Sequence, residues 1–181
     1  HMRVITGTAR GVQLKAPKGM DTRPTMDQVK EGMFSAIQFE VEGRRVLDLF
    51  AGSGQLGIEA LSRGAAHCTF IDRGKEPCAI VRENLKKTRL EDRATVLQAD
   101  YSSYLKTCRQ QFDLLLLDPP YAEIFLESAL KIVSEIDILT NSGIIVCERP
   151  CNKELSGEFP GLVCYREYRY GKAAVTIFRK A

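Results

Sequence analysis

Residues 46–57 read Val46-Leu-Asp-Leu-Phe-Ala-Gly-Ser-Gly-Gln-Leu-Gly57, an apolar run that leads through a glycine-rich turn into a helical pattern. Gly52 and Gly54 allow positive φ and a close approach of the backbone to a ligand. The N–H groups at the start of the following helix are free to bind a carboxylate or a phosphate. A strand, a glycine turn and a helix in this order are typical of the nucleotide-binding unit of α/β proteins.

Outside this stretch, apolar runs continue to alternate with helical patterns. Strands buried on both faces of a sheet read as continuous apolar runs, and 114–117 is such a run. We therefore predict an α/β domain with a mostly parallel sheet and helices on both faces. The predicted strands are 46–50, 68–71, 94–97, 112–117 and 144–147; the predicted helices are one ending at Arg63, 77–87, a short one around Tyr104, and 124–133.

The two ends of the chain have patterns of their own. Residues 3–15 alternate weakly and predict a small hairpin, followed by a loop rich in proline and glycine. Thr25 and Gln28 fit a capping box, which predicts a helix that begins just after Thr25. At the other end, 162–169 and 173–178 predict an antiparallel hairpin at one edge of the sheet.

The composition limits the class of protein. A chain of 181 residues, 44% of them hydrophobic and 27% charged, is long enough for one domain. We expect a single domain over 1–181, with an N-terminal extension (3–24) and a core (25–181). No apolar window reaches the length of a membrane helix, so we expect a soluble cytoplasmic protein without a membrane partner. The 6 cysteines have no Cys-x-x-Cys pair and only 2 histidines accompany them, so we expect no metal.

Positive charge is concentrated at the ends of the chain. The net charge is +3, but residues 1–30 have 6 basic and 2 acidic side chains and residues 166–180 have 5 basic and 1 acidic. Each end thus carries +4, which leaves −5 for residues 31–165. Clusters of lysine and arginine bind phosphates and gain affinity from counterion release. The two ends are therefore candidates for contact with a polyanion.

Acidic residues accompany three successive predicted strands. Asp48 lies inside the first strand, Asp72 ends the second and Asp100 follows the third. Ligands of such folds bind at the edge where the carboxyl ends of the strands meet. Asp72 suits the two hydroxyls of a ribose. Asp100 suits either an adenine amino group or the N-cap of the next helix.

The glycines alone do not select the cofactor. Gly52 to Gly57, with Asp72 twenty residues after Gly52, also fit the dinucleotide fingerprint. Asp48 favours S-adenosylmethionine, because a carboxylate near the loop suits the ammonium group of a methionine moiety and repels a pyrophosphate. The loop has no Gly-Lys-Ser/Thr, which disfavours hydrolysis of ATP or GTP.

The motif Asp118-Pro-Pro-Tyr121 directly follows the predicted strand 112–117. Consecutive prolines fix an extended backbone and remove N–H donors, which leaves carbonyl oxygens and the Asp118 carboxylate as acceptors. Two acceptors can hold the two hydrogens of an amine and stabilise the positive charge that develops on its nitrogen during methyl transfer. Tyr121 offers a face on which a base can stack. In isolation the motif would fit a proline-rich turn, but after a buried strand and together with the glycine loop it indicates amine methylation.

With these motifs the sequence resembles the class I S-adenosylmethionine-dependent methyltransferases. Asp-Pro-Pro-Tyr is their amino-methyltransferase signature. The narrower resemblance, over nearly the whole chain, is to bacterial small-subunit ribosomal RNA guanine-N2 methyltransferases of the RsmD type. It rests on Arg10-Gly11 with Leu14 and Pro17, Thr22-Arg-Pro-Thr25, Val29-Lys-Glu31, Met33-Phe34, 47–54 and 57–64.

The resemblance implies a Rossmann-like, seven-stranded sheet whose last strand is antiparallel. It implies transfer of a methyl group from S-adenosylmethionine, with S-adenosylhomocysteine as product, to one loop guanine of 16S rRNA in an assembled or assembling small subunit, by a monomer without a metal. The implied catalytic residues are Asp118, Pro119, Pro120 and Tyr121. The implied cofactor-binding residues are Asp48, Phe50, Ala51, Gly52, Ser53, Gly54, Asp72, Arg73, Asp100, Tyr101 and Asp118, and the implied RNA-binding residues are Arg10, Arg23, Thr25 and Lys172.

Three other functions compete with this one. Another amino-methyltransferase would act on DNA bases or on a protein glutamine. However, the glutamine enzymes begin the motif with Asn, and the DNA enzymes usually carry an additional recognition domain. A nicotinamide-dependent dehydrogenase fits the glycine spacing but leaves residues 118–121 without a role. A non-catalytic RNA-binding assembly factor would not need the acidic and aromatic motif.

Overall fold

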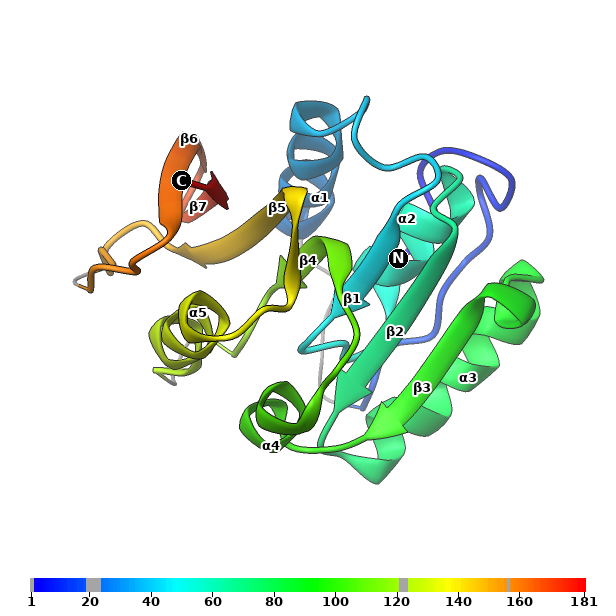
Figure 1. The fold of residues 1–181 in the computed structure, drawn as a ribbon. Helices are drawn as coiled ribbons and strands as arrows, with labels where there is room; N and C mark the ends of the chain where they lie inside the picture. The colour runs from blue at the N-terminus through cyan, green and yellow to red at the C-terminus, as the bar shows by residue number, and fades with distance from the viewer. Residues whose placement is uncertain (1, 19–23, 121–123, 156) are drawn as a thin grey trace.

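The computed structural model describes residues 2–18, 24–120, 124–155 and 157–181, and of 24–26 only the backbone. Within these ranges seven strands form one sheet in the order β3-β2-β1-β4-β5-β7-β6 (Figure 1). The strands are β1 (Arg45–Asp48), β2 (His67–Asp72), β3 (Ala94–Gln98), β4 (Phe112–Leu117), β5 (Leu139–Pro150), β6 (Leu162–Tyr170) and β7 (Ala173–Lys180).

The first five strands run parallel, and β7 is antiparallel to both of its neighbours, β5 and β6. The prediction of a seven-stranded, mostly parallel sheet with an antiparallel last strand is therefore confirmed. The β6–β7 turn therefore lies at the same edge of the sheet as the carboxyl ends of β1 to β5, because Ala173 pairs with Pro150.

Helices cover both faces of the sheet, as predicted (Figure 1). The helices are α1 (Pro24–Ala36), α2 (Gln55–Ser62), α3 (Lys75–Thr88), α4 (Tyr101–Thr107) and α5 (Phe125–Glu135), with a short 3₁₀ helix at Glu91–Arg93. Residues of α1, α2 and α3 pack with Val46 and Phe70 on one face, and residues of α4 and α5 pack with Leu47 and Leu115 on the other. Adjacent residues of β1 thus enter different cores, as expected for a strand buried on both sides.

Some predicted boundaries are wrong. β1 ends at Asp48 rather than at residue 50. β5 is much longer than 144–147, because it begins at Leu139, which pairs with Phe112 of β4, and continues to Pro150, which pairs with Ala173 of β7. Helix α1 begins at Pro24, so Thr25 lies inside the first turn and is not its N-cap. Proline fits that position, because the first turn of a helix has no use for its missing N–H.

The N-terminal segment (2–18) packs against α2. The Val4 N–H donates to the Val12 carbonyl at 3.0 Å, and Arg3 and Gln13 form one antiparallel bridge, which gives the predicted hairpin in a minimal form. The buried Glu59 carboxylate of α2 accepts the N–H groups of Ile5 and Thr6 at 2.9 and 3.0 Å. This segment is therefore part of the packed structure.

None of the helices in the described ranges is long and apolar enough to cross a membrane. All six cysteines lie within those ranges and are free thiols, and three of them are buried.

Candidate active site

The glycine loop and the end of β2 are joined by Asp72. Its two carboxylate oxygens accept the N–H groups of Gly52 and Gly74 at 3.0 and 2.9 Å. Gly52 and Gly54 have φ of 58° and 83°, and Gly54 is the N-cap of α2 in the left-handed region. The loop therefore has the backbone geometry that the sequence predicted, and Asp72 stands beside it at the carboxyl edge of the sheet.

Gly57 allows α2 to lie close to the sheet. A Cβ atom at this position would stand 2.3 Å from the Phe70 ring and 2.7 Å from Cys68 Sγ. The third glycine of the pattern thus serves helix–strand packing, as it does in nucleotide-binding folds generally.

Asp48 is almost fully buried at the end of β1. Its Oδ2 atom accepts the Gly57 N–H at 3.0 Å, whereas Oδ1 has no hydrogen-bond partner among the described residues. Burial raises the pKa of this carboxyl to about 7, against the Gly57 hydrogen bond, which lowers the pKa. A buried carboxylate oxygen without a partner, such as Asp48 Oδ1, needs a hydrogen-bond donor, so Asp48 fits the ammonium group of a methionine moiety.

Asn84 of α3 ties the glycine loop to the N-terminal segment. Its amide nitrogen donates to the carbonyls of Ser53 and Lys15, both at 2.9 Å, and its oxygen accepts the Lys15 N–H at 2.8 Å. Ser53 is itself buried, and its hydroxyl donates to Met2 Sδ at 3.3 Å. Asn84 was not predicted as a functional residue, because a buried asparagine within a helical pattern has no distinctive spacing.

We expect Asn84→Ala to lower the free energy of unfolding by about 3 kcal/mol, because three hydrogen bonds are lost and their backbone partners stay largely buried. The expected effect is measured by urea denaturation, with the exposed Asn152→Ala as the matched control. A loss below about 1 kcal/mol, comparable to that of the control, would contradict this role.

Three predicted cofactor-binding residues, Phe50, Arg73 and Tyr101, meet around the ring of Phe125 in an aromatic cluster. The rings of Phe50, Tyr101 and Phe125 lie with centroids 5.1 to 6.1 Å apart, and the Arg73 guanidinium stands 5.9 Å from the Phe125 centroid. Phe125 was missed, because its place at the start of a predicted apolar helix indicated only packing. The cluster brings together the segments that follow β1, β2, β3 and β4.

Asp100 takes the second of its two predicted roles. Its carboxylate accepts the Ser103 N–H at 3.1 Å and caps α4. The side chain is exposed, and its contact with an adenine stays a prediction.

Asp118 and Glu148 lie side by side at the carboxyl edge. Leu117 pairs with Cys147 across β4 and β5, so the next residue after each of them, Asp118 and Glu148, projects to the same face. Burial of the Asp118 carboxyl group raises its pKa well above the usual range, and the neighbouring acidic groups of Glu148 and Asp48 raise it further. Glu148 was missed, because register between β4 and β5 is not visible in the sequence.

The rest of the motif consists of Pro119, Pro120 and Tyr121. Pro119 is buried and Pro120 is exposed, while Tyr121 lies outside the described residues.

The predicted RNA-binding residues do not all lie at this edge. Lys172 does, in the exposed β6–β7 turn. Arg10 is exposed in the turn of the N-terminal segment, where neighbouring Ala9 donates to Ser62 Oγ at the far end of α2 from the glycine loop. Arg23 lies outside the described residues, and of Thr25 only the backbone in the first turn of α1 is described.

The charge count overstates the basic surface. Lys30 is buried and pairs with Glu59 at 3.2 Å, and Arg179 pairs with Glu40 at 2.7 Å. Neither side chain is free for a phosphate, so these two residues do not add to a surface that could bind RNA.

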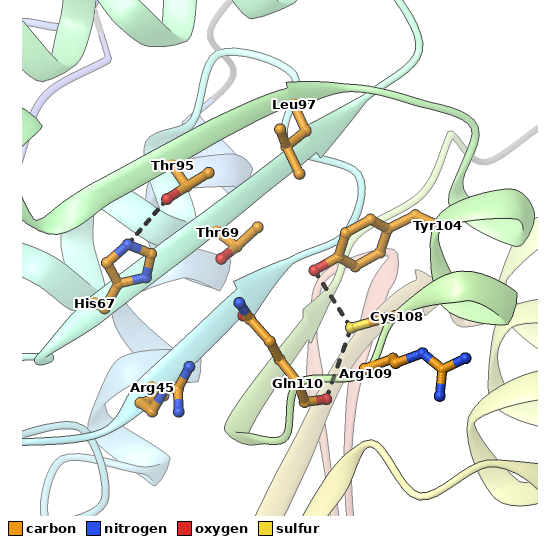
Figure 2. Close-up of a pocket in the computed structure, with 9 residues that line it drawn as sticks. All are labelled: Arg45, His67, Thr69, Thr95, Leu97, Tyr104, Cys108, Arg109 and Gln110. Carbon is orange, nitrogen blue, oxygen red and sulfur yellow. Dashed lines mark hydrogen bonds between the residues drawn. The ribbon is translucent and has the colours of Figure 1, made fainter.

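A cavity of about 500 Å³ lies elsewhere, between α4 and the sheet. Figure 2 shows its lining, in which His67 and Thr95 hydrogen-bond to each other and Tyr104 lies beside Cys108. None of the residues predicted for cofactor, catalysis or RNA lines it, so this cavity is separate from the candidate site.

The sheet order, the antiparallel β7 and the glycine loop after β1 together define a Rossmann-like class I methyltransferase fold. The structure titled "Putative methyltransferase yhhF from Escherichia coli" has the same fold, with a TM-score of 0.89, 29% identity and coverage of 99% of this chain and 97% of that one.

The sequence comparisons agree with the fold. The family model described as "Conserved hypothetical protein 95" matches residues 2–179, and the chain belongs to this family. The chain is 43% identical to "Putative rRNA methyltransferase YlbH" of Bacillus subtilis over 182 residues, 99% of each chain. It is 32% identical to "Ribosomal RNA small subunit methyltransferase D" of Escherichia coli, over 93% of this chain and 90% of that one. The resemblance to the RsmD type is thereby confirmed.

Proposed function

We propose that this protein transfers a methyl group from S-adenosylmethionine to the exocyclic N2 amine of a guanine in small-subunit ribosomal RNA. The observation that carries the proposal is the position of Asp118. It directly follows β4 at the edge where Asp48, the glycine loop and Asp72 also lie. Relatives named as rRNA methyltransferases support RNA as the substrate class.

The residues of the cofactor region fit S-adenosylmethionine. Asp48 would hold the ammonium group, Asp72 the ribose hydroxyls, and the loop at Gly52 to Gly54 the methionine carboxylate. Bound S-adenosylmethionine supplies an activated methyl group and leaves as S-adenosylhomocysteine. No group of three or more metal-ligating side chains occurs within the described ranges, and the proposed reaction does not call for a metal.

Asp118 and the Pro119 carbonyl would accept the two N–H groups of the guanine amine. This contact localises the nitrogen lone pair and stabilises the positive charge that develops as the C–N bond forms. The amine becomes acidic only at that stage, so its proton passes to the Asp118 carboxyl group and then to water. Alignment of the two substrates supplies much of the rate enhancement.

The proposed substrate is a loop guanine within an assembled or assembling small subunit. A base in a loop is already partly unpaired, so its rotation into the site costs less than the flipping of a duplex base. The protein would act as a monomer in the cytoplasm, and its basic residues Arg10, Arg23 and Lys172, with Thr25, would contact the RNA.

We expect Lys172→Ala to weaken RNA binding and to lower the slope of log K against log salt by about 1, because one phosphate contact is lost. Fluorescence anisotropy with a labelled RNA fragment measures both. Lys87→Ala is the control, because this exposed lysine lies at the end of α3 that is remote from the site. A slope equal to that of the wild type would remove Lys172 from the RNA interface.

Transfer of labelled methyl groups tests the function. Small subunits lacking their native modifications, protein-free small-subunit RNA, duplex DNA and a glutamine-containing peptide would be compared. The proposal expects incorporation into the subunit or its RNA and none into DNA or peptide. Incorporation into DNA or peptide instead would favour the other amino-methyltransferase functions. Cofactor binding without any transfer would favour a non-catalytic assembly factor, and a thermal shift with NAD but not with S-adenosylmethionine would favour a dehydrogenase.

A further inference from the structure

Strand β6 is the outer strand of the sheet beside β7, and one of its faces carries aromatic and basic side chains. Tyr168 pairs with Val175 and Arg166 with Ile177, and both of these β7 residues pack in the core that α1, α2 and α3 cover. Because cross-strand partners project to the same face, Tyr168 and Arg166 lie on that face of the sheet.

The Asp118 carboxyl group projects to the same face. Leu114 and Leu116 of β4 pack in the core beneath α1, α2 and α3, and alternate residues of a strand share a face. The proposed catalytic residue and this side of β6 are therefore on one side of the sheet.

Four side chains of β6 with planar groups form a continuous row, Tyr165, Arg166, Tyr168 and Tyr170, which we call the β6 stripe. The Arg166 guanidinium lies 5.3 Å from the centroid of the Tyr165 ring and donates to the Tyr168 hydroxyl at 3.2 Å. The rings of Tyr168 and Tyr170 follow with centroids 6.4 Å apart. A bulge between Cys164 and Arg166 inserts Tyr165 into the strand and brings its ring beside Arg166.

Both ends of the stripe are held in place. The Tyr170 ring packs against α1 at Gly32, where a Cβ atom would stand 2.2 Å from the ring. At the other end, the Arg179 guanidinium lies 4.3 Å from the Tyr165 centroid and pairs with Glu40 at 2.7 Å. The Tyr165 side chain is nevertheless 49% exposed. Planar groups that are fixed before a ligand arrives lose little conformational entropy when it binds.

The stripe carries a positive charge that no carboxylate neutralises. None of the ion pairs within the described ranges includes Arg166, which is exposed. Glu167 projects to the opposite face, where its carboxylate accepts from Arg149 at 2.8 Å and from Thr176 at 3.2 Å. Aromatic rings and guanidinium planes stack with the bases of single-stranded RNA, and a guanidinium also binds phosphate.

The stripe ends at the edge of the sheet where the candidate site lies. Tyr170 is followed by the turn that carries Lys172, at the same edge as the carboxyl ends of β1 to β5. From β4 to β6 there are three strand spacings of about 4.8 Å, which places β6 roughly 14 Å from the strand that Asp118 follows. Nucleotides that flank a base bound at Asp118 can reach across this distance.

We propose that the β6 stripe binds the single-stranded RNA that flanks the target nucleotide, by stacking of bases on Tyr165 and Arg166 and by contact of Arg166 with a phosphate. This inference rests on the proposed function, because it takes RNA as the substrate. A second copy of the chain is a less suitable occupant. The bulge and the exposed Arg166, Glu167 and Arg169 oppose the pairing of β6 with another strand.

Two labelled oligomers separate stacking from phosphate contact. One is oligoadenylate, and the other is an abasic oligomer with the same number of phosphates. At low salt the wild type should bind oligoadenylate at least about tenfold more tightly, because only its bases can stack. Tyr165→Ala should lower this preference at least about fivefold, whereas Tyr165→Phe, which keeps the ring, should retain it. Fluorescence anisotropy measures all four affinities.

Substitutions of Arg166 test the charge and the plane of the guanidinium. Arg166→Ala should weaken the binding of both oligomers and lower the slope of log K against log salt by about 0.7. Arg166→Lys keeps the charge and therefore the slope, but it should lower the preference for oligoadenylate, because the planar group is lost. Arg109→Ala is the control, because this exposed arginine lines the cavity between α4 and the sheet and is remote from β6.

Several results would overturn the inference. They are a wild type that binds both oligomers equally or binds neither, or Tyr165→Ala and Arg166→Lys variants that keep the full preference for oligoadenylate. Sedimentation that shows a dimer of the wild type, lost in Tyr165→Ala while RNA binding is unchanged, would assign β6 to a second copy instead. Urea denaturation of each variant shows whether the fold is intact.

The nucleoside that the wild type methylates is scored separately. A product other than N2-methylguanosine refutes the proposed function, whereas the oligomer comparison still tests the stripe. N2-methylguanosine formed by the wild type, together with wild-type binding of both oligomers by every β6 variant, refutes the stripe alone.

Discussion

Asp118→Ala should reduce turnover by about 10² to 10⁴-fold and leave the affinity for S-adenosylmethionine within about threefold of the wild-type value. The substitution removes the carboxyl group that would hold the amine and accept its proton. It leaves the glycine loop intact, because Asp72, and not Asp118, accepts the loop N–H group. Single-turnover kinetics and isothermal titration calorimetry measure the two quantities.

Asp118→Asn is the matched variant. Its amide oxygen can still accept one N–H of the amine, but it carries no charge and takes no proton. Its rate should therefore lie between those of the wild type and Asp118→Ala. Normal methyl transfer by Asp118→Ala would show that this residue has been given the wrong role.

Asp48→Asn should weaken the binding of S-adenosylmethionine by about 10- to 100-fold, because the buried carboxylate that pairs with the ammonium group loses its charge. The amide oxygen can still accept the Gly57 N–H, so the start of α2 keeps its anchor. Calorimetry at pH 8 measures the affinity. Unchanged binding would mean that Asp48 serves only to anchor the helix.

The same substitution, which should weaken cofactor binding, should increase the stability of the folded protein at high pH. Because the folded-state pKa of Asp48 is raised to about 7, from 3.8, its contribution is fully present below pH 4 and is lost as the pH rises to 7. Relative to the wild type, Asp48→Asn should thus gain about 2 to 4 kcal/mol in the free energy of unfolding between pH 4 and pH 8. Urea denaturation at both pH values measures the gain. A constant difference between the two proteins would contradict the shifted pKa.

Local pattern was sufficient to predict the elements of the fold. The apolar run at 112–117 is β4 with no change of boundary, because only Asp113 interrupts a run of buried apolar residues. The antiparallel strand at the end came from the family resemblance and from the hairpin pattern around Gly171. The length of β5 was not predictable, because its two ends depend on pairing with Phe112 of β4 and with β7, both of which are distant in the sequence.

The residues of the site were predictable where their role depends on local backbone geometry. Gly52, Gly54 and Asp72 stand out because a glycine turn between a strand and a helix is local, and the structure brings them together. Asn84 and Glu148 escaped prediction because their roles arise from contacts between distant segments: a helix with the N-terminal segment, and one strand with its neighbour. The burial of Lys30 could not be read from a charge count for the same reason.

The most direct measurement is mass spectrometry of nucleosides from small subunits that lack their native modifications, after incubation with the protein and labelled S-adenosylmethionine. The expected result is labelled N2-methylguanosine from one site in the RNA, formed by the wild type and strongly reduced with Asp118→Ala. Label in any other nucleoside, or label in N2-methylguanosine that Asp118→Ala forms at the wild-type rate, would contradict the proposed reaction.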